Sequence, residues 1–226
     1  MSSPTQTTTP PPEAGFDPLA FWILHRQKIV LFVGVFVAAL AIYFISEIMA
    51  ARKRDASARL LAEAKDGDGW RKVIAEYGGT AAAGDAHLLL AEQLRKDGKL
   101  DESASTLRQF IDKYPEHPLL SGAWTSLGAT LEAQGKTDEA LSTYQKVTTT
   151  FATSFSVPGA LLSQARIFKE KEKTDEAKRL YDQVINQYPE TIFAQLAMRE
   201  TQQLKKHPRD AVTPPAAAGS PADPSK

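Results

Sequence analysis

Apolar positions in the middle of the chain follow the spacing of paired amphipathic helices, and the pattern returns every 37 residues. Leu127 and Leu131 lie four residues apart, as on one face of a helix, and Tyr144 and Val147 mark a second helix. Each second helix begins with a similar acidic phrase, LDES at 100–103, TDEA at 137–140 and TDEA at 174–177. A repeat of this length predicts stacked helical hairpins rather than one globular core.

Two kinds of position recur within the repeat. Small residues stand where the two helices of a hairpin must approach closely, and these are Ala91, Gly128 and Ala165. Large residues recur in the second helix, as Leu107, Tyr144 and Tyr181. From Trp124 to Val147 the sequence resembles the tetratricopeptide pattern of W-x2-L-G-x2-Y followed by A-x3-F. The resemblance implies hairpins that present a groove to binding partners.

The pattern extends weakly beyond the full repeats at both ends. Gly69–Tyr77 aligns with a second helix, so it predicts a degenerate first unit whose partner helix is the polar stretch after residue 50. Phe193–Lys205 predicts a single capping helix. We therefore expect an all-α fold, in which a single transmembrane helix precedes a tetratricopeptide (helical hairpin) solenoid of about three full repeats, a degenerate first unit and a capping helix.

One uncharged run near the N-terminus, Ile29–Ser46, is 18 residues long. At about 1.5 Å per residue it covers most of a hydrocarbon core of about 30 Å, and Glu47–Ala50 can extend it. A buried core helix is one alternative, but nothing nearby could cover it on all sides. A cleaved signal peptide is another, but the run is long and Glu47–Ala51 makes a poor cleavage site. The sequence therefore favours a retained anchor.

These observations divide the chain into five predicted segments. We expect a disordered Pro-rich tail at 1–20, a membrane anchor helix at 21–50, a juxtamembrane helix and degenerate first repeat at 51–83, three tetratricopeptide repeats with a capping helix at 84–206, and a disordered tail at 207–226.

Composition and motifs argue against catalysis and nucleic-acid binding. The 27 basic and 27 acidic residues give a formal net charge of zero, whereas nucleic-acid binding needs a clustered basic surface. The chain has no cysteine, so thiolate chemistry is excluded, and its four histidines are scattered. The repeated Asp-Glu pairs lie where helices begin, so we expect them to cap free N–H groups and to suit the helix dipole rather than to serve acid–base catalysis. We expect no enzyme activity, no cofactor, no metal and no small-molecule substrate.

The tetratricopeptide resemblance also implies which residues line the groove, because the first helix of each hairpin faces it. These residues are Asp85, Leu88, Glu92 and Arg95 in the first full repeat, Gly122, Thr125, Ala129 and Glu132 in the second, and Gly159, Leu162, Arg166 and Lys169 in the third. The face is expected to grade from acidic to basic, with small or apolar residues between. It suits an extended peptide or a partner helix, so we expect protein or peptide partners. The same residues also fit an ordinary solvated face.

The layout of the chain brings a closer resemblance, which covers roughly Phe21 to Asn186. A short tail, one span and a small repeat domain are similar to the YfgM family, an ancillary component of the bacterial Sec translocon, and the stretches 71–77 and 100–104 are similar to its first repeats. The Tyr-Pro repeat endings also resemble envelope proteins of the YbgF and BamD types. The resemblance implies a periplasmic domain that binds translocon-associated chaperones and emerging envelope proteins.

Charge and resemblance give opposite predictions for the side of the membrane. Two basic residues precede the span, Arg26 and Lys28, and four follow it, Arg52, Lys53, Arg54 and Arg59. The positive-inside rule therefore places the repeats in the cytoplasm, for instance as a scaffold in cell division or organelle organisation. The family resemblance places them outside. We follow the resemblance and expect a single-pass protein of the inner membrane with periplasmic repeats.

Overall fold

The structure of the chain is a computed structural model that describes residues 18–206. These residues form nine helices and their connecting turns, with no strand among them. The chain divides between Arg52 and Lys53 into two compact units. Residues 1–17 and 207–226, which we expected to be disordered, lie outside the described part of the chain.

Helix α1 runs from Pro18 to Glu63 and supplies all the described residues of the first unit. It begins inside the segment 1–20 for which we expected disorder, since residues 18–20 are already helical. Proline is well suited to this first position, because its missing N–H has no partner in a first turn and its φ is already helical.

The N-terminal part of α1 carries a segment that is long and apolar enough to cross a membrane. The 18 residues that qualify lie within His25–Glu63, and none of them is buried inside the structure. Large side chains are exposed on different sides of this helix, for example Phe32, Val33 and Val35. A helix that is apolar on every side is typical of a membrane span or of a helix buried in a large protein, so this segment is a candidate membrane span.

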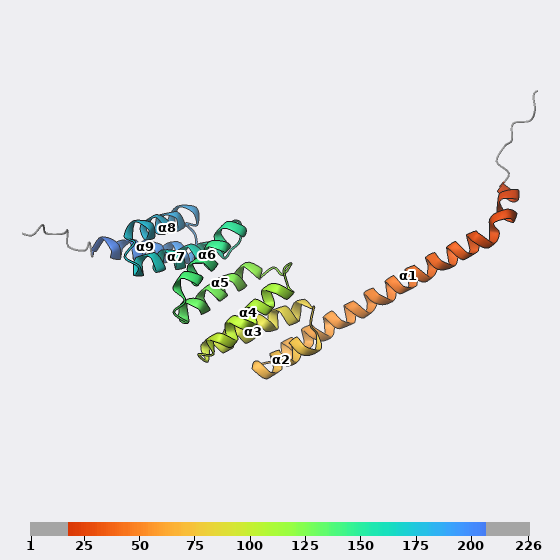
Figure 1. Ribbon diagram of the computed structural model, residues 1–226, viewed down its shortest axis with the longest axis horizontal. Coiled ribbons are helices and arrows are strands. Elements are labelled where there is room, and N and C mark those ends of the chain that lie inside the picture. The colour runs from red at the N-terminus through yellow and green to blue at the C-terminus, as the bar shows by residue number, and fades with distance from the viewer. Residues whose placement is uncertain (1–17, 207–226) are drawn as a thin grey trace, which may run out of the picture. The chain divides into compact units, whose positions relative to one another are not determined.

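The second unit is a stack of antiparallel helical hairpins (Figure 1). Each of its helices packs against the next one along the chain. The helices are α2 (Gly67–Glu76), α3 (Ala81–Lys96), α4 (Leu100–Lys113), α5 (Leu120–Ala133), α6 (Thr137–Thr150), α7 (Val157–Glu170), α8 (Thr174–Gln187) and α9 (Ile192–Lys206). The hairpins α3–α4, α5–α6 and α7–α8 are the three full repeats, so the expected all-α repeat fold is confirmed.

The turn inside each hairpin has a left-handed residue at the same repeat position. Gly98 has φ 74° and Gly135 has φ 76°, a conformation that glycine adopts without steric cost. The third turn has Glu172 there instead, with φ 62°. A side chain in this conformation costs about 1–2 kcal/mol, so the third hairpin has the least favourable turn.

The repeated acidic residues at the starts of α4, α6 and α8 do not have the capping role that we expected. We expected them to cap free N–H groups, but the N-cap residues of α4, α6 and α8 are lysines without a side-chain capping bond. The acids occupy the first turn, where they interact favourably with the helix dipole. Asp101 also accepts a hydrogen bond from Gln134 at 2.9 Å, and Asp138 pairs with Lys171. Gln134 and Lys171 occupy equivalent repeat positions, and so do Asp101 and Asp138. A polar contact at this position therefore joins neighbouring repeats twice.

The last eleven residues of α1, from Lys53 on, supply the first helix of the degenerate unit. Ser57 is buried, and Leu60 and Leu61 pack against the main hydrophobic cluster. The turn that follows is held by Asp66, whose carboxylate accepts the N–H of Gly69 at 2.8 Å and so caps α2. This aspartate therefore serves as a helix cap.

Helix α9 closes the other end of the array. Ala194 and Ala197 are fully buried, whereas Met198 is exposed. Met198 is equivalent to the buried Leu161, and Gln202 stands at the position of the small Ala165. Polar residues on the outer face of a terminal helix end the stack, because no further hairpin can pack there.

The small and large repeat positions contact each other at the centre of the hairpins. Tyr144 is fully buried, and a Cβ atom placed on Gly128 would lie 2.5 Å from its ring carbon Cε1. The absent side chain of Gly128 is thus the space that the Tyr144 ring fills, and α5 and α6 approach each other closely there.

We expect Gly128→Ala to lower the free energy of unfolding by about 1–3 kcal/mol, because the new methyl group overpacks a filled core. Thermal denaturation followed by circular dichroism measures the effect. Gly122→Ala is the matched control on the same helix, since its Cβ would lie 3.7 Å from Phe155 in ordinary contact. An equal loss of stability in both variants would contradict the packing described here.

Tyr144 and Tyr181 occupy the same repeat position but differ at the hydroxyl group. The Tyr144 hydroxyl donates a hydrogen bond to Glu132 at 3.0 Å, whereas the buried Tyr181 hydroxyl has no partner among the described residues. Burial raises the pKa of both phenols, to about 12 for Tyr181, and the Glu132 carboxylate raises the pKa of Tyr144 further.

We expect Tyr144→Phe to cost about 1–3 kcal/mol of folding free energy, because it leaves the Glu132 carboxylate without its hydroxyl donor. Tyr181→Phe should be neutral or stabilising, since it removes an unpaired polar atom. Chemical denaturation measures both, and a larger loss in Tyr181→Phe would refute the assignment.

The raised pKa of the buried phenol also makes the stability of the fold depend on pH. Its proton-linked contribution to stability is fully present below the unfolded pKa of about 10. That stability decreases as the pH rises toward the folded pKa, and Tyr181→Phe should reduce the decrease.

Candidate protein-binding groove

The first helices of the repeats, α3, α5 and α7, line two neighbouring cavities. Cavity I lies between α3 and α5 and measures about 220 Å³. Cavity II lies between α5 and α7 and measures about 400 Å³. Both are lined by Gly122, Ser126 and Phe155, so the two cavities form one continuous depression, which we call the groove.

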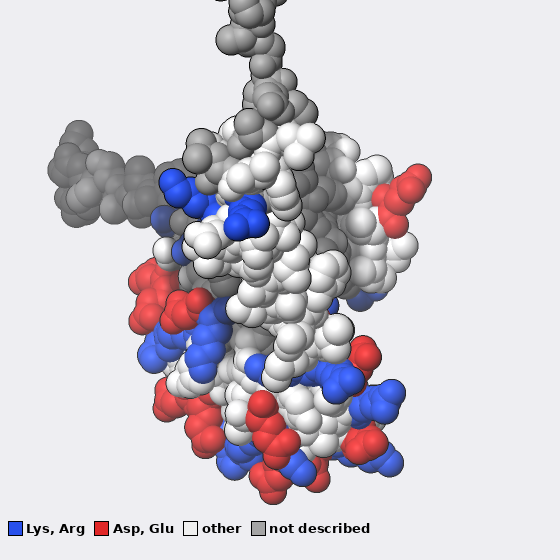
Figure 2. Space-filling model, turned by 90° about the vertical axis from the view of Figure 1, so that its right-hand side faces the viewer, with Lys and Arg blue, Asp and Glu red and all other residues white. Residues whose placement is uncertain are grey.

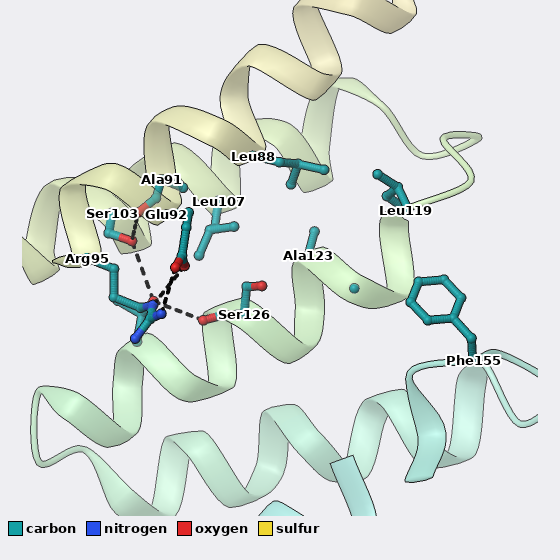
Figure 3. A pocket seen from close by; sticks show the side chains of 12 residues that line it. Leu88, Ala91, Glu92, Arg95, Ser103, Leu107, Leu119, Ala123, Ser126 and Phe155 are labelled. Atoms are coloured by element: carbon teal, nitrogen blue, oxygen red, sulfur yellow. Dashed lines mark hydrogen bonds and ion pairs between the residues drawn. The ribbon is translucent and has the colours of Figure 1, made fainter. Parts of the chain in front are cut away.

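Figure 3 shows the arrangement of side chains in cavity I. Leu88 from α3 and Ala123 from α5 form its centre, and Leu119 and Phe155 lie together at one end. Glu92 and Arg95 lie at the other end. The cavity is therefore apolar along most of its length and charged at one end only.

The groove brings together part of the predicted set of residues. Leu88, Glu92 and Arg95 line cavity I, and Thr125, Leu162 and Arg166 line cavity II, together with the predicted glycines at 122 and 159. Ala129, Glu132 and Lys169 line neither cavity. Asp85 lines a separate cavity between α3 and the stretch 54–62 of α1.

The charged residues of the groove are paired with one another. Arg95 binds Glu92 through two hydrogen bonds of 3.0 and 2.9 Å. Arg166 on α7 donates to Glu132 on α5 at 2.7 Å, and the same carboxylate accepts the Tyr144 hydroxyl. We expected charges that grade from acidic to basic along this face, but each basic group is neutralised by a carboxylate beside it.

The third basic residue of the predicted set is paired in the same way. The Lys169 ammonium group contacts Glu200 on α9 at 2.6 Å. Both side chains are partly buried, which protects the pair from screening by salt. Figure 2 shows the same intermixing more widely, because the face that it displays has acidic and basic side chains side by side and no large patch of one sign.

The sequence pattern missed the aromatic residues of the groove. Phe155 is 66% exposed and stands in the connection between α6 and α7, where it lines both cavities. Phe193 at the start of α9 lines cavity II, and its ring would lie 3.3 Å from a Cβ atom on Gly159. The available signal was the lengthened connection between hairpins, in which Phe155 and Ile192 stand 37 residues apart.

The described histidines have separate, structural environments. His87 is buried, its Nδ1 donates to the Ala83 carbonyl at 2.7 Å, and burial lowers its pKa. His117 accepts the Leu119 N–H at the start of α5 and faces Asp85 at 3.5 Å. Among residues 18–206 no group of three or more His, Asp or Glu side chains is arranged to hold a metal ion.

Comparison with solved structures agrees with the fold. The nearly identical TPR-like repeats from Podosopora anserina, in a protein described as a putative kinesin light chain, share 17% sequence identity and a TM-score of 0.51, covering 69% of this chain and 85% of theirs. A single-substitution variant of the same repeats shares 16% identity and a TM-score of 0.52, covering 69% and 84%.

No curated protein matches the sequence. The family model described as "Tetratricopeptide repeat-like domain" matches residues 20–206. This match covers most of the chain and contains every helix that lines the groove. The chain belongs to the family of proteins with a tetratricopeptide repeat-like domain.

Proposed function

We propose that this chain is a membrane-anchored protein-interaction module of the bacterial cell envelope. In this role it assists or scaffolds the Sec translocon and the handling of translocated proteins by periplasmic chaperones. The observation that carries the proposal is the combination, in one chain, of a candidate membrane span with a tetratricopeptide repeat-like domain. Repeats of this kind bind proteins or peptides, and the groove offers a surface for doing so.

Location in the inner membrane, with the repeats in the periplasm, follows from the resemblance to the YfgM family. The layout of a short tail, one apolar helix and a small helical repeat domain supports it. The anchor would keep the repeat domain attached to the membrane across which translocated polypeptides emerge before they fold.

A cytoplasm-facing scaffold is the second candidate, and the distribution of basic residues favours it. Four arginine or lysine residues follow the apolar run at positions 52–59, against two before it at Arg26 and Lys28. By the positive-inside rule, the larger number of basic residues stays in the cytoplasm.

Site-specific labelling with a membrane-impermeant maleimide separates the two candidates, because the chain has no cysteine of its own. Thr153 is an exposed position in the connection between α6 and α7, whereas its neighbour Ser154 is hydrogen-bonded to Ser121. We expect Thr153→Cys to react in cells whose inner membrane is intact and whose outer membrane is permeabilised.

The matched control is Ser3→Cys, which lies before the apolar run. It should react only after the inner membrane is lysed. The reverse pattern would refute the periplasmic placement and favour the cytoplasmic scaffold. Purification of the full chain from solubilised membranes tests the partner directly, since recovery of translocon subunits with a chaperone is expected, and recovery of cytosolic assembly factors alone would refute it.

A further inference from the structure

We propose that the groove binds an uncharged, apolar and extended segment of another polypeptide, with one large apolar side chain in cavity I. This inference rests on the proposed function only in that the chain binds polypeptides. It specifies the chemistry of the segment that is bound and the residue that anchors it.

The first argument is the pairing of charges around the groove. Arg95 is occupied by Glu92, Arg166 by Glu132 and Lys169 by Glu200. An acidic ligand would have to displace a carboxylate that is already in place, so it would exchange one ion pair for another and gain little. A basic ligand would meet carboxylates that already bind arginine or lysine. The groove is therefore electrostatically complementary to a neutral segment.

The size and lining of cavity I supply the second argument. Its volume of about 220 Å³ lies below the range of about 300–1,000 Å³ that is usual for small-molecule sites. Leu88, Leu119, Ala123 and Phe155 give it an apolar wall. A cavity of this size and character fits a large side chain of a peptide better than a free metabolite.

Phe155 is the third argument, because it is the most exposed aromatic residue of the groove. The residue is 66% exposed although it lines both cavities. Phe155 thus lies where the two cavities adjoin, and aromatic side chains that a partner covers often dominate the binding energy of an interface. Covering this ring with an apolar side chain would remove apolar surface from water.

The hydroxyl group of Ser126 favours an extended segment over a helix. Ser126 is exposed, lines both cavities, and its hydroxyl has no partner among the described residues. An extended peptide has free backbone N–H and C=O groups that can bond to this hydroxyl, whereas a helix has already paired them. Side chains i and i+2 of an extended peptide point the same way, so they can enter the two adjoining cavities.

The test measures binding of fluorescent peptides to the full chain in lipid nanodiscs. The probe is an extended peptide of about ten Ser, Ala and Leu residues, and two matched versions carry Glu or Lys in place of the central Leu. We expect each charged version to bind about tenfold more weakly or worse, because burial of a charge is costly. Affinity for the neutral probe should stay nearly constant from about 50 to about 500 mM NaCl, since no free charge is involved.

Variants identify the anchoring residue. We expect Phe155→Ala to weaken binding of the neutral probe by about tenfold, as for an interface hot spot. The matched control is Ile192→Ala, because Ile192 is 61% exposed at the equivalent position one repeat later and lines neither cavity. It should bind like the unchanged protein. Ser126→Phe, an exposed substitution that fills the groove, should abolish binding while the melting curve is retained.

Three outcomes would overturn the inference. Equal or tighter binding of a charged peptide would show that the paired charges exchange readily. Equal losses in Phe155→Ala and Ile192→Ala would indicate unspecific adhesion to exposed apolar residues. A tenfold gain in affinity when the chain is ended at Lys206 would identify its own segment 207–226 as the occupant. If the peptide-binding test fails but Thr153→Cys is labelled from the periplasm, the proposed envelope role still stands. The two proposals can therefore be refuted separately.

Discussion

The close approach of two helices at one small residue determines the geometry of the whole array. Where Gly128 faces Tyr144, no room exists for a side chain on α5, and the aromatic ring fills the space between the helices. The same arrangement of small and large residues recurs at Ala165 and Tyr181, both fully buried. Because the second helix of each hairpin then packs against the first helix of the next one, the groove has the shape that this spacing gives it.

Much of the fold could be predicted from the sequence because it depends on residue size at fixed intervals. The sequence shows a small residue at Gly128 and a large one at Tyr144, and the 37-residue interval predicts the hairpins that α3 to α8 form. The candidate span was equally readable from an uncharged run. The lysine N-caps could not be predicted, because a run of acidic residues at a helix start does not reveal which residue is the N-cap.

The groove was predicted less completely, for a physical reason. Which side chains face a common side depends on helical periodicity alone, so Leu88, Thr125 and Leu162 could be placed. Whether Arg166 reaches Glu132 depends on rotamers and on the distance between α5 and α7, which the sequence does not contain. Phe155 lies in a connection outside the helices, so helical periodicity alone could not place it in the groove.

The hydrophobic core of the repeats falls into two clusters that meet in α7. Ala160 and Ile167 belong to the cluster that reaches back to α2, and Val157, Leu161 and Ala165 belong to the one that reaches α9. Local unfolding in proteins proceeds by such cooperative units. The clustered buried residues of α8 and α9 belong to the second cluster only, so local opening of these two helices would release Phe193 from cavity II without unpacking the first cluster. Cavity I lies wholly on α3–α5 and Phe155, so it would persist as a docking site while its neighbour opens and closes.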